Sequence, residues 1–303
     1  MSKPKTSRPS SDHLPLQARA SKRLQTEKPI AHPSERTVRI AGLPAVTALF
    51  RRDPDRVLRF FYEERMVPFV GEFCAYMARV RRPYRMVEDE ELARIAGSML
   101  HGGIVAVAEP QPIRPFDLAE ARRWARSGQT LFILDGVSNS HNLGAIARTL
   151  AFFGFRHLLI SDHPAQTGLS DSAYRVAEGG LEYVQVYKAT SLPDALQRLR
   201  HDYRVAGTAL GRGVPLETLE QDPRPIALVL GNEEQGAPAA TLAACETIVT
   251  LPGSGQIQSL NVSATAAILA YALRPKTNEN RRVHFPNPLK EKPKRVVARK
   301  RTG

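Results

Sequence analysis

Three polar segments of the 303-residue chain contain the side chains best suited to chemistry. The first, DGVSNSHN at 135–142, ends in Asn142 and is followed by Arg148. The second, LGNEEQGAP at 230–238, carries the carboxylate of Glu233. The third, LPGSGQIQSLN at 251–261, ends with the hydroxyl of Ser259 and the amide of Asn261. Amides, carboxylates and hydroxyls of this kind can hold and orient a polar ligand.

Each of these segments directly follows a predicted strand. From residue 130 to residue 273, apolar runs such as TLFILD and PIALVLG alternate with helical patterns such as NLGAIARTLAFFG. This alternation predicts a mostly parallel sheet with helices on both faces. Ligands of such sheets bind at the carboxyl ends of the strands. We therefore expect the three segments to converge on one pocket.

The usual signatures of phosphate and metal sites are missing from the sequence. No GxxxxGK[ST] occurs, and neither GRGVPL nor GSGQIQ completes a GxGxxG fingerprint. The His and Cys spacings match no metal motif, so we predict no metal site. A nucleotide-like ligand would therefore need another kind of cradle.

A smaller α/β domain is predicted upstream, over residues 37–109. We expect helices at 53–66, 69–82 and 88–100, and strands at 38–42, 83–87 and 102–110. Nine arginines fall between Arg51 and Arg85 against five acidic residues, which predicts a basic face suited to phosphates. Residues 110–129 are predicted to be a linker with a short helix around Trp124.

The net charge of +13 comes from the two ends of the chain. Residues 1–36 carry +5 and residues 276–303 carry +8, and both segments are rich in Pro and Lys. We expect two disordered basic tails, suited to a polyanion such as RNA or acting only as solubilising ends. No apolar run is long enough to span a membrane and no secretory signal is visible, so we expect a cytoplasmic protein.

Together the three segments resemble the motifs of the SpoU/TrmH-type RNA ribose 2′-O-methyltransferases, a branch of the trefoil-knot SPOUT superfamily. Asn-x-Gly-x-x-x-Arg is matched at 142–148, and Gly-Asn-Glu-x-x-Gly is matched at 231–236. Pro-x-x-Gly-x-x-x-Ser-Leu-Asn-Val-Ser is matched at 252–263. Residues 37–109 resemble the substrate-recognition domain of the same family. The most similar branch comprises uncharacterised bacterial TrmH-like tRNA/rRNA methyltransferases with long basic ends.

The resemblance implies a knotted α/β methyltransferase domain over 130–275 that binds S-adenosyl-L-methionine. A thin helix is needed to pass close to other backbone, and the segment 259–273 is rich in alanine. The cofactor-binding residues that the resemblance implies are Leu230, Gly231, Leu251, Gly255 and Leu260. The catalytic residues that it implies are Asn142, Arg148, Glu233, Ser259 and Asn261.

The implied roles follow the chemistry of methyl transfer to a ribose 2′-hydroxyl. Arg148 is a poor base, so we expect it to hold an RNA phosphate and polarise the hydroxyl. Asn142 would orient Arg148 or the ribose, and Glu233 would hold the motif loops and face the positive sulfonium. Ser259 and Asn261 would fix the third segment and bond to the substrate. Removal of the hydroxyl proton stays open.

The resemblance also implies a homodimer that acts on tRNA or rRNA. Two alternatives stay open: a catalytically silent RNA-binding relative of the same fold, and an unrelated doubly wound enzyme with another cofactor.

Two departures from the family pattern bear on RNA placement. Glu234 stands where Gly or Lys is usual, and AEGG at 177–180 replaces a more usual Ser-Ala-Gly-Ala.

Overall fold

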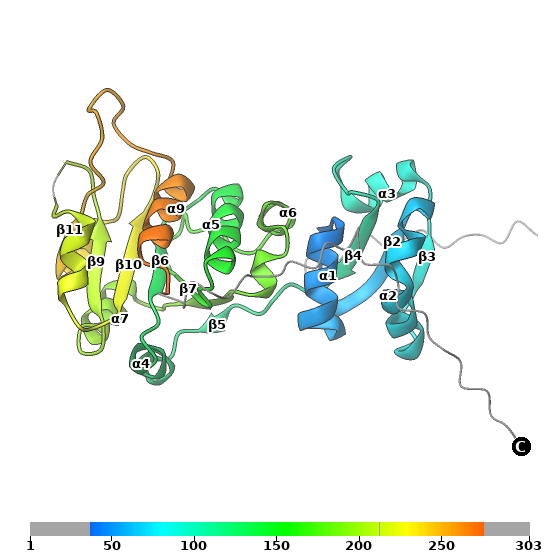
Figure 1. Cartoon of the computed structure of the whole chain (residues 1–303), viewed down its shortest axis with the longest axis horizontal. Coiled ribbons are helices and arrows are strands. Elements are labelled where there is room, and N and C mark those ends of the chain that lie inside the picture. Colours follow the sequence, from blue (N-terminus) through cyan, green and yellow to red (C-terminus); the bar gives the residue numbers. More distant parts are fainter. Residues whose placement is uncertain (1–36, 212, 276–303) are drawn as a thin grey trace, which may run out of the picture. The chain divides into compact units, whose positions relative to one another are not determined.

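The computed structural model describes residues 37–211 and 213–275. Their helices and strands build a four-stranded sheet from residues 38–108 and a seven-stranded sheet from residues 114–249 (Figure 1). The two basic tails predicted at 1–36 and 276–303 lie outside the described residues. In the described ranges, no helix is long and apolar enough to cross a membrane.

The four-stranded sheet has the order β1-β4-β2-β3. Its strands are β1 (Val38–Ala41), β2 (Val57–Tyr62), β3 (Tyr84–Met86) and β4 (Ile104–Ala108). The strands β1 and β2 run antiparallel to β4, and β3 runs parallel to β2. The helices of this part are α1 (Leu43–Arg52), α2 (Val67–Arg79) and α3 (Asp89–Ala96).

The helix predicted at 53–66 is wrong. Asp53 and Pro54 begin only a single 3-10 turn, η1 (Pro54–Arg56), and another, η2 (Glu64–Met66), follows the strand β2. The segment VLRFFY of β2 is rich in aromatic and branched side chains, and it pairs with β4 on one side and β3 on the other. Strand pairing therefore overrides the local helix-start signal. The helix α1 was not predicted.

The seven-stranded sheet has the order β11-β9-β10-β6-β7-β8-β5, and every neighbouring pair is parallel. Its strands are β5 (Arg114–Pro115), β6 (Leu131–Asp135), β7 (His157–Ile160), β8 (Gln185–Lys188), β9 (Arg204–Thr208), β10 (Ile226–Gly231) and β11 (Thr247–Val249). The predicted parallel α/β sheet is confirmed.

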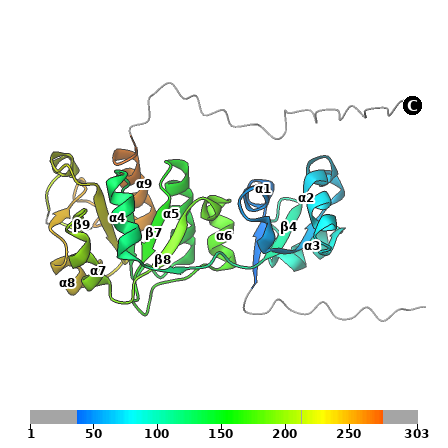
Figure 2. The same cartoon turned by 90° about the horizontal axis from the view of Figure 1, so that it is seen from below.

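Helices cover both faces of this sheet because successive strand residues point to opposite sides. Phe132 and Leu134 of β6 pack with α5 (Ser140–Phe152), α6 (Asp171–Ala177) and α9 (Val262–Ala272). Leu131 and Ile133 pack with α4 (Leu118–Arg126) and α7 (Leu192–Leu199). The helices α5 and α9 lie side by side (Figures 1 and 2).

The segment predicted as a linker, 110–129, takes part in this sheet. The short strand β5 pairs with β8 at one edge. Asp117 caps α4 by accepting a 2.8 Å hydrogen bond from the backbone N–H of Ala119. Ala121 and Ala125 then bury against the sheet, so the segment adds a layer rather than only a connection.

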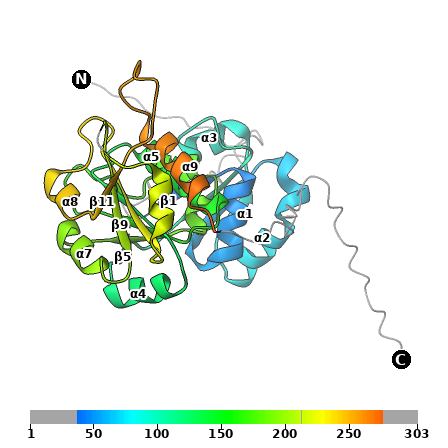
Figure 3. The same ribbon diagram turned by 60° about the vertical axis from the view of Figure 1, so that its left-hand side comes forward.

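The carboxyl ends of the central strands carry the three segments identified in the sequence. β6 and β10 are neighbours, with Gly231 paired to Asp135, so the first two segments start side by side. The third leaves β11 at the edge of the sheet and forms the long orange loop that leads into α9 (Figure 3). The convergence predicted from the sequence therefore has its basis in the strand order.

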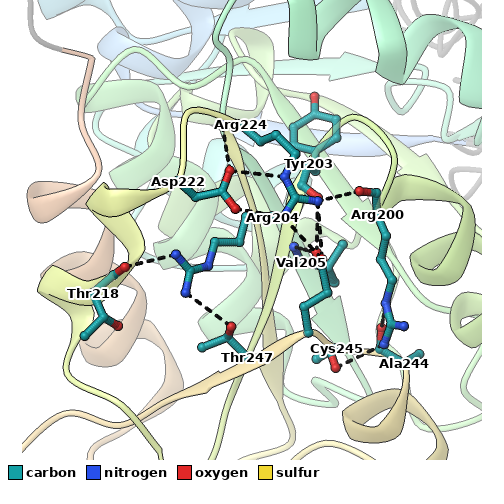
Figure 4. A network of polar contacts seen from close by, with 11 residues as sticks. Arg200, Tyr203, Arg204, Val205, Thr218, Asp222, Arg224, Ala244, Cys245 and Thr247 are labelled. Carbon is teal, nitrogen blue, oxygen red and sulfur yellow. Dashed lines mark hydrogen bonds and ion pairs between the residues drawn. The ribbon is translucent and has the colours of Figure 1, made fainter.

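The amino ends of β9, β10 and β11 are held together by a network of arginines (Figure 4). Arg224 donates to Asp222 at 2.7 Å, to Glu246 at 3.3 Å and to the carbonyl of Tyr203 at 3.1 Å. Hydrogen bonds from Arg224 lower the pKa of Asp222 to about 2. Arg200 donates to the carbonyls of Ala244 and Cys245, which ties the end of α8 (Ala239–Ala243) to the same network.

Candidate active site

The turn after β10 is built around the side chain of Asn232. Its Oδ1 accepts hydrogen bonds from the backbone N–H groups of Glu234, at 2.9 Å, and Gln235, at 3.1 Å. Its backbone pairs in both directions with Gly236, which has a φ of 71°. Its Nδ2 donates to the carbonyl of Gly136, at 2.9 Å. One side chain therefore fixes this turn and joins it to the first polar segment.

Close packing at the base of the turn requires glycine at position 231. A Cβ atom on Gly231 would lie 2.1 Å from the backbone nitrogen of Ala237. Real Cβ atoms essentially never approach backbone so closely, and the atom in the way cannot rotate aside. The glycine therefore allows the chain after the turn to pass directly over the end of β10.

Three predicted catalytic residues, Asn142, Glu233 and Asn261, form one hydrogen-bonded cluster. The Nδ2 of Asn142 donates to Oε1 of Glu233, and the Oδ1 of Asn142 accepts from Nδ2 of Asn261 at 3.1 Å. Asn142 is 8 % exposed and lies in the first turn of α5. Asn261 caps α9 by accepting from the backbone N–H of Ser263 at 2.8 Å. The three segments meet in this cluster.

Arg148, the fourth predicted catalytic residue, lies away from the cluster. Its Nη2 is 2.9 Å from Oε2 of Glu178, and both side chains are more than half exposed. Because helical residues advance by about 100° each, six positions turn Arg148 about 120° away from Asn142 around α5. Within one chain, Arg148 therefore faces the segment 177–180, whose sequence departs from the family pattern.

The larger hollow beside the turn has a volume of about 860 Å³. All five predicted cofactor-binding residues line it, and so does Ser259: Leu230, Gly231, Leu251, Gly255, Ser259 and Leu260. Its other walls include apolar side chains, among them Leu242, Val249 and Leu269. The only charged side chains among its described lining residues are the carboxylates of Glu233 and Glu234. This environment suits a ligand with an apolar surface and a positive charge.

A second hollow, of about 790 Å³, lies on the other side of the same turn. The cluster residues Asn142, Glu233 and Asn261 line it, together with Asp135 and His163. Residues 232–237 line both hollows. Glu233 therefore stands on the wall that the two hollows share, where a group bound in one can meet a group bound in the other.

Sequence reasoning missed three contributors to this site. Asn232 was matched to the motif but assigned no role, although it organises the turn. His163 follows β7, and its ring would be 3.3 Å from a Cβ on Gly136. Asp135 is 2 % exposed and accepts a 2.6 Å hydrogen bond from Thr241 of α8. The available signal was that Asp135 ends β6 and His163 shortly follows β7, a neighbouring parallel strand.

One group of possible metal ligands lies in the four-stranded part, formed by Glu63, Asp89 and His101. The Nδ1 of His101 accepts the backbone N–H of Gly103 at 3.2 Å. The Nε2 of a neutral His101 then carries the proton and faces Asp89 at 3.4 Å. The Nδ1 of the same ring lies 3.4 Å from Oε1 of Glu63, and the predicted absence of a metal stays a prediction.

Comparison with protein families matches both folded parts of the chain. Residues 129–271 match the SpoU rRNA Methylase family, and residues 39–113 match the family described as RNA 2'-O ribose methyltransferase substrate binding. The RlmB 23S rRNA (guanosine-2'-O-)-methyltransferase of Bordetella pertussis is 31 % identical over 234 residues, which cover 77 % of this chain and 94 % of the relative.

A further relative is the uncharacterized tRNA/rRNA methyltransferase YfiF of Escherichia coli O157:H7, which is 30 % identical over 235 residues. The match covers 76 % of this chain and 66 % of YfiF. An uncharacterized tRNA/rRNA methyltransferase of Haemophilus influenzae is matched over 45 % of its own length. An AdoMet-bound rRNA methyltransferase of Sinorhizobium meliloti superimposes with a TM-score of 0.66. It is 22 % identical, with 79 % of this chain and 87 % of the other covered, and it supports the fold alone.

The motifs, the parallel sheet and the match to RlmB over 94 % of its length agree with one another. The predicted family and α/β fold are confirmed, and methylation of RNA is the activity in the names of both family models. The chain belongs to the SpoU family of RNA ribose 2′-O-methyltransferases.

Proposed function

We propose that this protein transfers the methyl group of S-adenosyl-L-methionine to the ribose 2′-hydroxyl of a nucleotide in rRNA or tRNA. The observation that carries the proposal is the cluster of Asn142, Glu233 and Asn261 on the wall shared by two hollows. Methyl transfer needs the nucleophile and the methyl group to approach nearly in line. In the proposal, a donor in one hollow and a nucleotide in the other meet at Glu233, which lines both hollows.

The larger hollow fits S-adenosyl-L-methionine by its chemistry. When bound, this cofactor supplies an activated methyl group on a positive sulfonium, and it has no phosphate. The hollow has carboxylates and no Lys or Arg among its described lining residues. Its apolar walls suit the adenine and ribose. In the proposal, backbone groups around Gly231, Leu251 and Leu260, which line this hollow, pair with the adenine edge.

The cluster would orient the ribose hydroxyl. The side-chain amides of Asn142 and Asn261 fix Oε1 of Glu233 through two hydrogen bonds in series. The other carboxylate oxygen, Oε2, receives no hydrogen bond from the described residues and is free to accept one from the 2′-hydroxyl. A carboxylate on the shared wall also complements the sulfonium. Glu233 thus serves the nucleophile and the donor together.

A homodimer is part of the proposal. The helices α5 and α9 present a group of exposed apolar side chains: Phe152 is 72 % exposed, Ile268 45 % and Tyr271 58 %. Phe153 packs edge-on against Tyr271, so the two helices form one continuous surface. A contiguous exposed apolar surface marks an interaction site. Arg148 precedes Phe152 by four residues on the same face of α5, so a second copy docked here would meet Arg148.

The domain roles and the knot are also proposed. We assign RNA recognition to residues 37–109, which carry nine arginines between Arg51 and Arg85. Residues 130–275 would carry out methyl transfer, and residues 110–129 would connect the two domains. The knot is supported by the path of the chain, which leaves the edge strand β11, lines the larger hollow and returns as α9 beside α5. Ala266 and Ala270 of α9 are fully buried, as a close-packed helix requires. A cytoplasmic location suits an RNA substrate.

The test is methyl transfer from labelled S-adenosyl-L-methionine into total RNA from cells that lack this gene. We expect label in 2′-O-methylated nucleosides after digestion of the RNA. A protein that binds the cofactor and RNA but transfers nothing would instead be the catalytically silent relative. A protein that does not bind the cofactor in calorimetry would contradict the proposal altogether.

The nucleoside is proposed from the relatives. RlmB of Bordetella pertussis is named for methylation of guanosine in 23S rRNA, and it matches this chain over 94 % of its own length. We therefore propose a guanosine of rRNA as the target. Mapping of ribose methylation in rRNA from cells with and without the gene would locate it.

A further inference from the structure

The second hollow is large enough to hold the base of the substrate nucleotide while the cluster holds its ribose. It lies across the turn 232–237 from the larger hollow, and its volume of about 790 Å³ is large enough for a nucleoside. Asn142, Glu233 and Asn261 form part of its lining. A ribose held at these residues would direct its base into this hollow.

The charges around the second hollow exclude a phosphate. Its described lining residues include the carboxylates of Asp135, Glu233 and Glu234 and no Lys or Arg. A phosphate there would face three carboxylates with no cation among the described lining residues, and like charges repel. An uncharged group with several N–H donors is favoured instead. The RNA phosphates must therefore be bound elsewhere on the protein.

Glu234 provides an acceptor for such donors on a hydrogen-bonded turn. Its backbone N–H is held by Oδ1 of Asn232, at 2.9 Å, so the residue stands on the rigid part of the turn. Its side chain is exposed and lines the second hollow. Among the described residues, its carboxylate takes part in no hydrogen bond or ion pair. Two adjacent carboxylate oxygens are therefore available to two neighbouring N–H groups.

His163 provides a donor on the same hollow. Its Nδ1 accepts a 3.1 Å hydrogen bond from the backbone N–H of Ala165. In the neutral ring the proton must then be on Nε2, so this atom is a donor and cannot act as a base. The ring is held against Gly136 at the end of β6. The hollow thus offers one N–H donor and one bidentate acceptor.

We propose that the second hollow is a base pocket that reads the Watson–Crick edge of a flipped-out guanine. Glu234 accepts from N1–H and the N2 amino group, and His163 Nε2–H donates to O6. Uracil presents a single N–H between two carbonyls. Adenine and cytosine each present an amino group beside a ring nitrogen that accepts. None of these three bases can therefore donate to both carboxylate oxygens of Glu234. Flipped bases are commonly read through this edge. The inference rests on the proposed function and names the residues that select its substrate.

The test compares Glu234→Gln with Glu217→Gln in the full-length protein. Glu217 is an exposed carboxylate on η4 (Leu216–Gln221) that lines neither hollow, so it is a matched control. With total RNA from cells lacking the gene, wild type and Glu217→Gln should label 2′-O-methylguanosine. Glu234→Gln should lose about tenfold or more in rate, since one bidentate contact is lost. Because Glu234 also lines the larger hollow, the dissociation constant for S-adenosyl-L-methionine is measured by calorimetry for each protein, and the rates are compared at saturating cofactor.

A binding measurement separates this inference from the proposed function. Saturation-transfer NMR with guanosine and uridine, in the presence of S-adenosylhomocysteine, should detect guanosine on wild type and Glu217→Gln only. Three results would overturn the base pocket: a uridine signal equal to that of guanosine, a guanosine signal that is unchanged on Glu234→Gln, or label in another 2′-O-methylnucleoside. If wild type labels no RNA, the proposed function fails, and the nucleoside signals still decide whether the pocket reads guanine.

Discussion

Asn261 donates a 3.1 Å hydrogen bond from its Nδ2 to Oδ1 of Asn142, across 119 positions of sequence. Asn142 then donates to Glu233, so residues from all three polar segments orient one carboxylate. Side chains that act in series should behave as one unit when removed. Removing any one of them should therefore also remove what the others contribute to catalysis.

The first prediction concerns this unit. Asn142→Ala and Asn261→Ala should each lower the rate of methyl transfer by about 10²-fold, and the double variant should lose little more, because residues acting as a unit are not additive. Single-turnover rates at saturating cofactor measure this, with thermal unfolding as the check on folding. Losses that multiply in the double variant would mean that the two amides act separately.

Arg148 can be tested against its ion-pair partner. Arg148→Ala should abolish methyl transfer while the affinity for S-adenosyl-L-methionine, measured by calorimetry, stays within about twofold, because Arg148 lines neither hollow. Glu178→Gln breaks the same exposed ion pair and should retain activity, since such pairs contribute about 0–1 kcal/mol to stability. Full activity in Arg148→Ala would remove the residue from the mechanism.

Gly231→Ala should disrupt the turn between the hollows. The added Cβ would meet the backbone of Ala237, so we expect a loss of about 1–3 kcal/mol in the free energy of unfolding and loss of cofactor binding. Gly71→Ala is the matched control, because Gly71 lies inside α2 with open space around its Cβ position. That change should stabilise by about 0.5–1 kcal/mol. Urea unfolding and calorimetry measure both, and normal cofactor binding by Gly231→Ala would contradict the close packing.

The apolar face of α5 and α9 predicts the state of assembly. The wild-type protein should sediment as a dimer, and Phe152→Glu should sediment as a monomer with reduced methyl transfer, because a carboxylate would be buried in the interface. Leu100→Glu is the control, since Leu100 is 79 % exposed and lies outside these helices. A monomeric wild type, or a Phe152→Glu protein that remains dimeric, would show that this face has another role.

His157 predicts a pH dependence of stability. Burial, with the charge of Arg156 adding to it, lowers the pKa of His157 to about 4 from 6.5. The unfolded chain therefore binds more protons between these values, so this contribution to stability is complete above pH 6.5 and is lost as the pH falls toward 4. After allowance for solvent screening, the loss by pH 5 should be about 1 kcal/mol.

His157→Phe provides the control for this prediction. The His157 ring stacks on Trp124 with centroids 3.9 Å apart, and a phenyl ring keeps the stacking without titrating. Urea unfolding at pH 7 and pH 5 should show the extra loss in wild type only. Trp124 is the only tryptophan of the chain, so its fluorescence should also report protonation of His157, with a midpoint near pH 4. A midpoint near 6.5 would show that the imidazole is not desolvated.

Secondary structure was predictable where the hydrophobic pattern was long, and the prediction failed where that pattern was short. The alternation of strands and helices over 130–273 is repeated many times, and the sheet follows it. At 53–66 a helix-start signal at Asp53 precedes the segment VLRFFY, which is apolar except for Arg59 and fits a helix or a strand equally. Only pairing with β4 on one side and β3 on the other decides for a strand.

The sequence by itself determined the family, the parallel sheet and the three segments that meet at its carboxyl edge, because motif spacing and hydrophobic periodicity are local properties. The tertiary structure alone decided that Arg148 faces Glu178, that Asn232 joins two segments, and that His163 and Glu234 border a second hollow. These facts depend on which strands become neighbours and on how far a helix turns between two residues. Long-range strand pairing and side-chain direction arise from packing of the whole chain, which no single segment encodes.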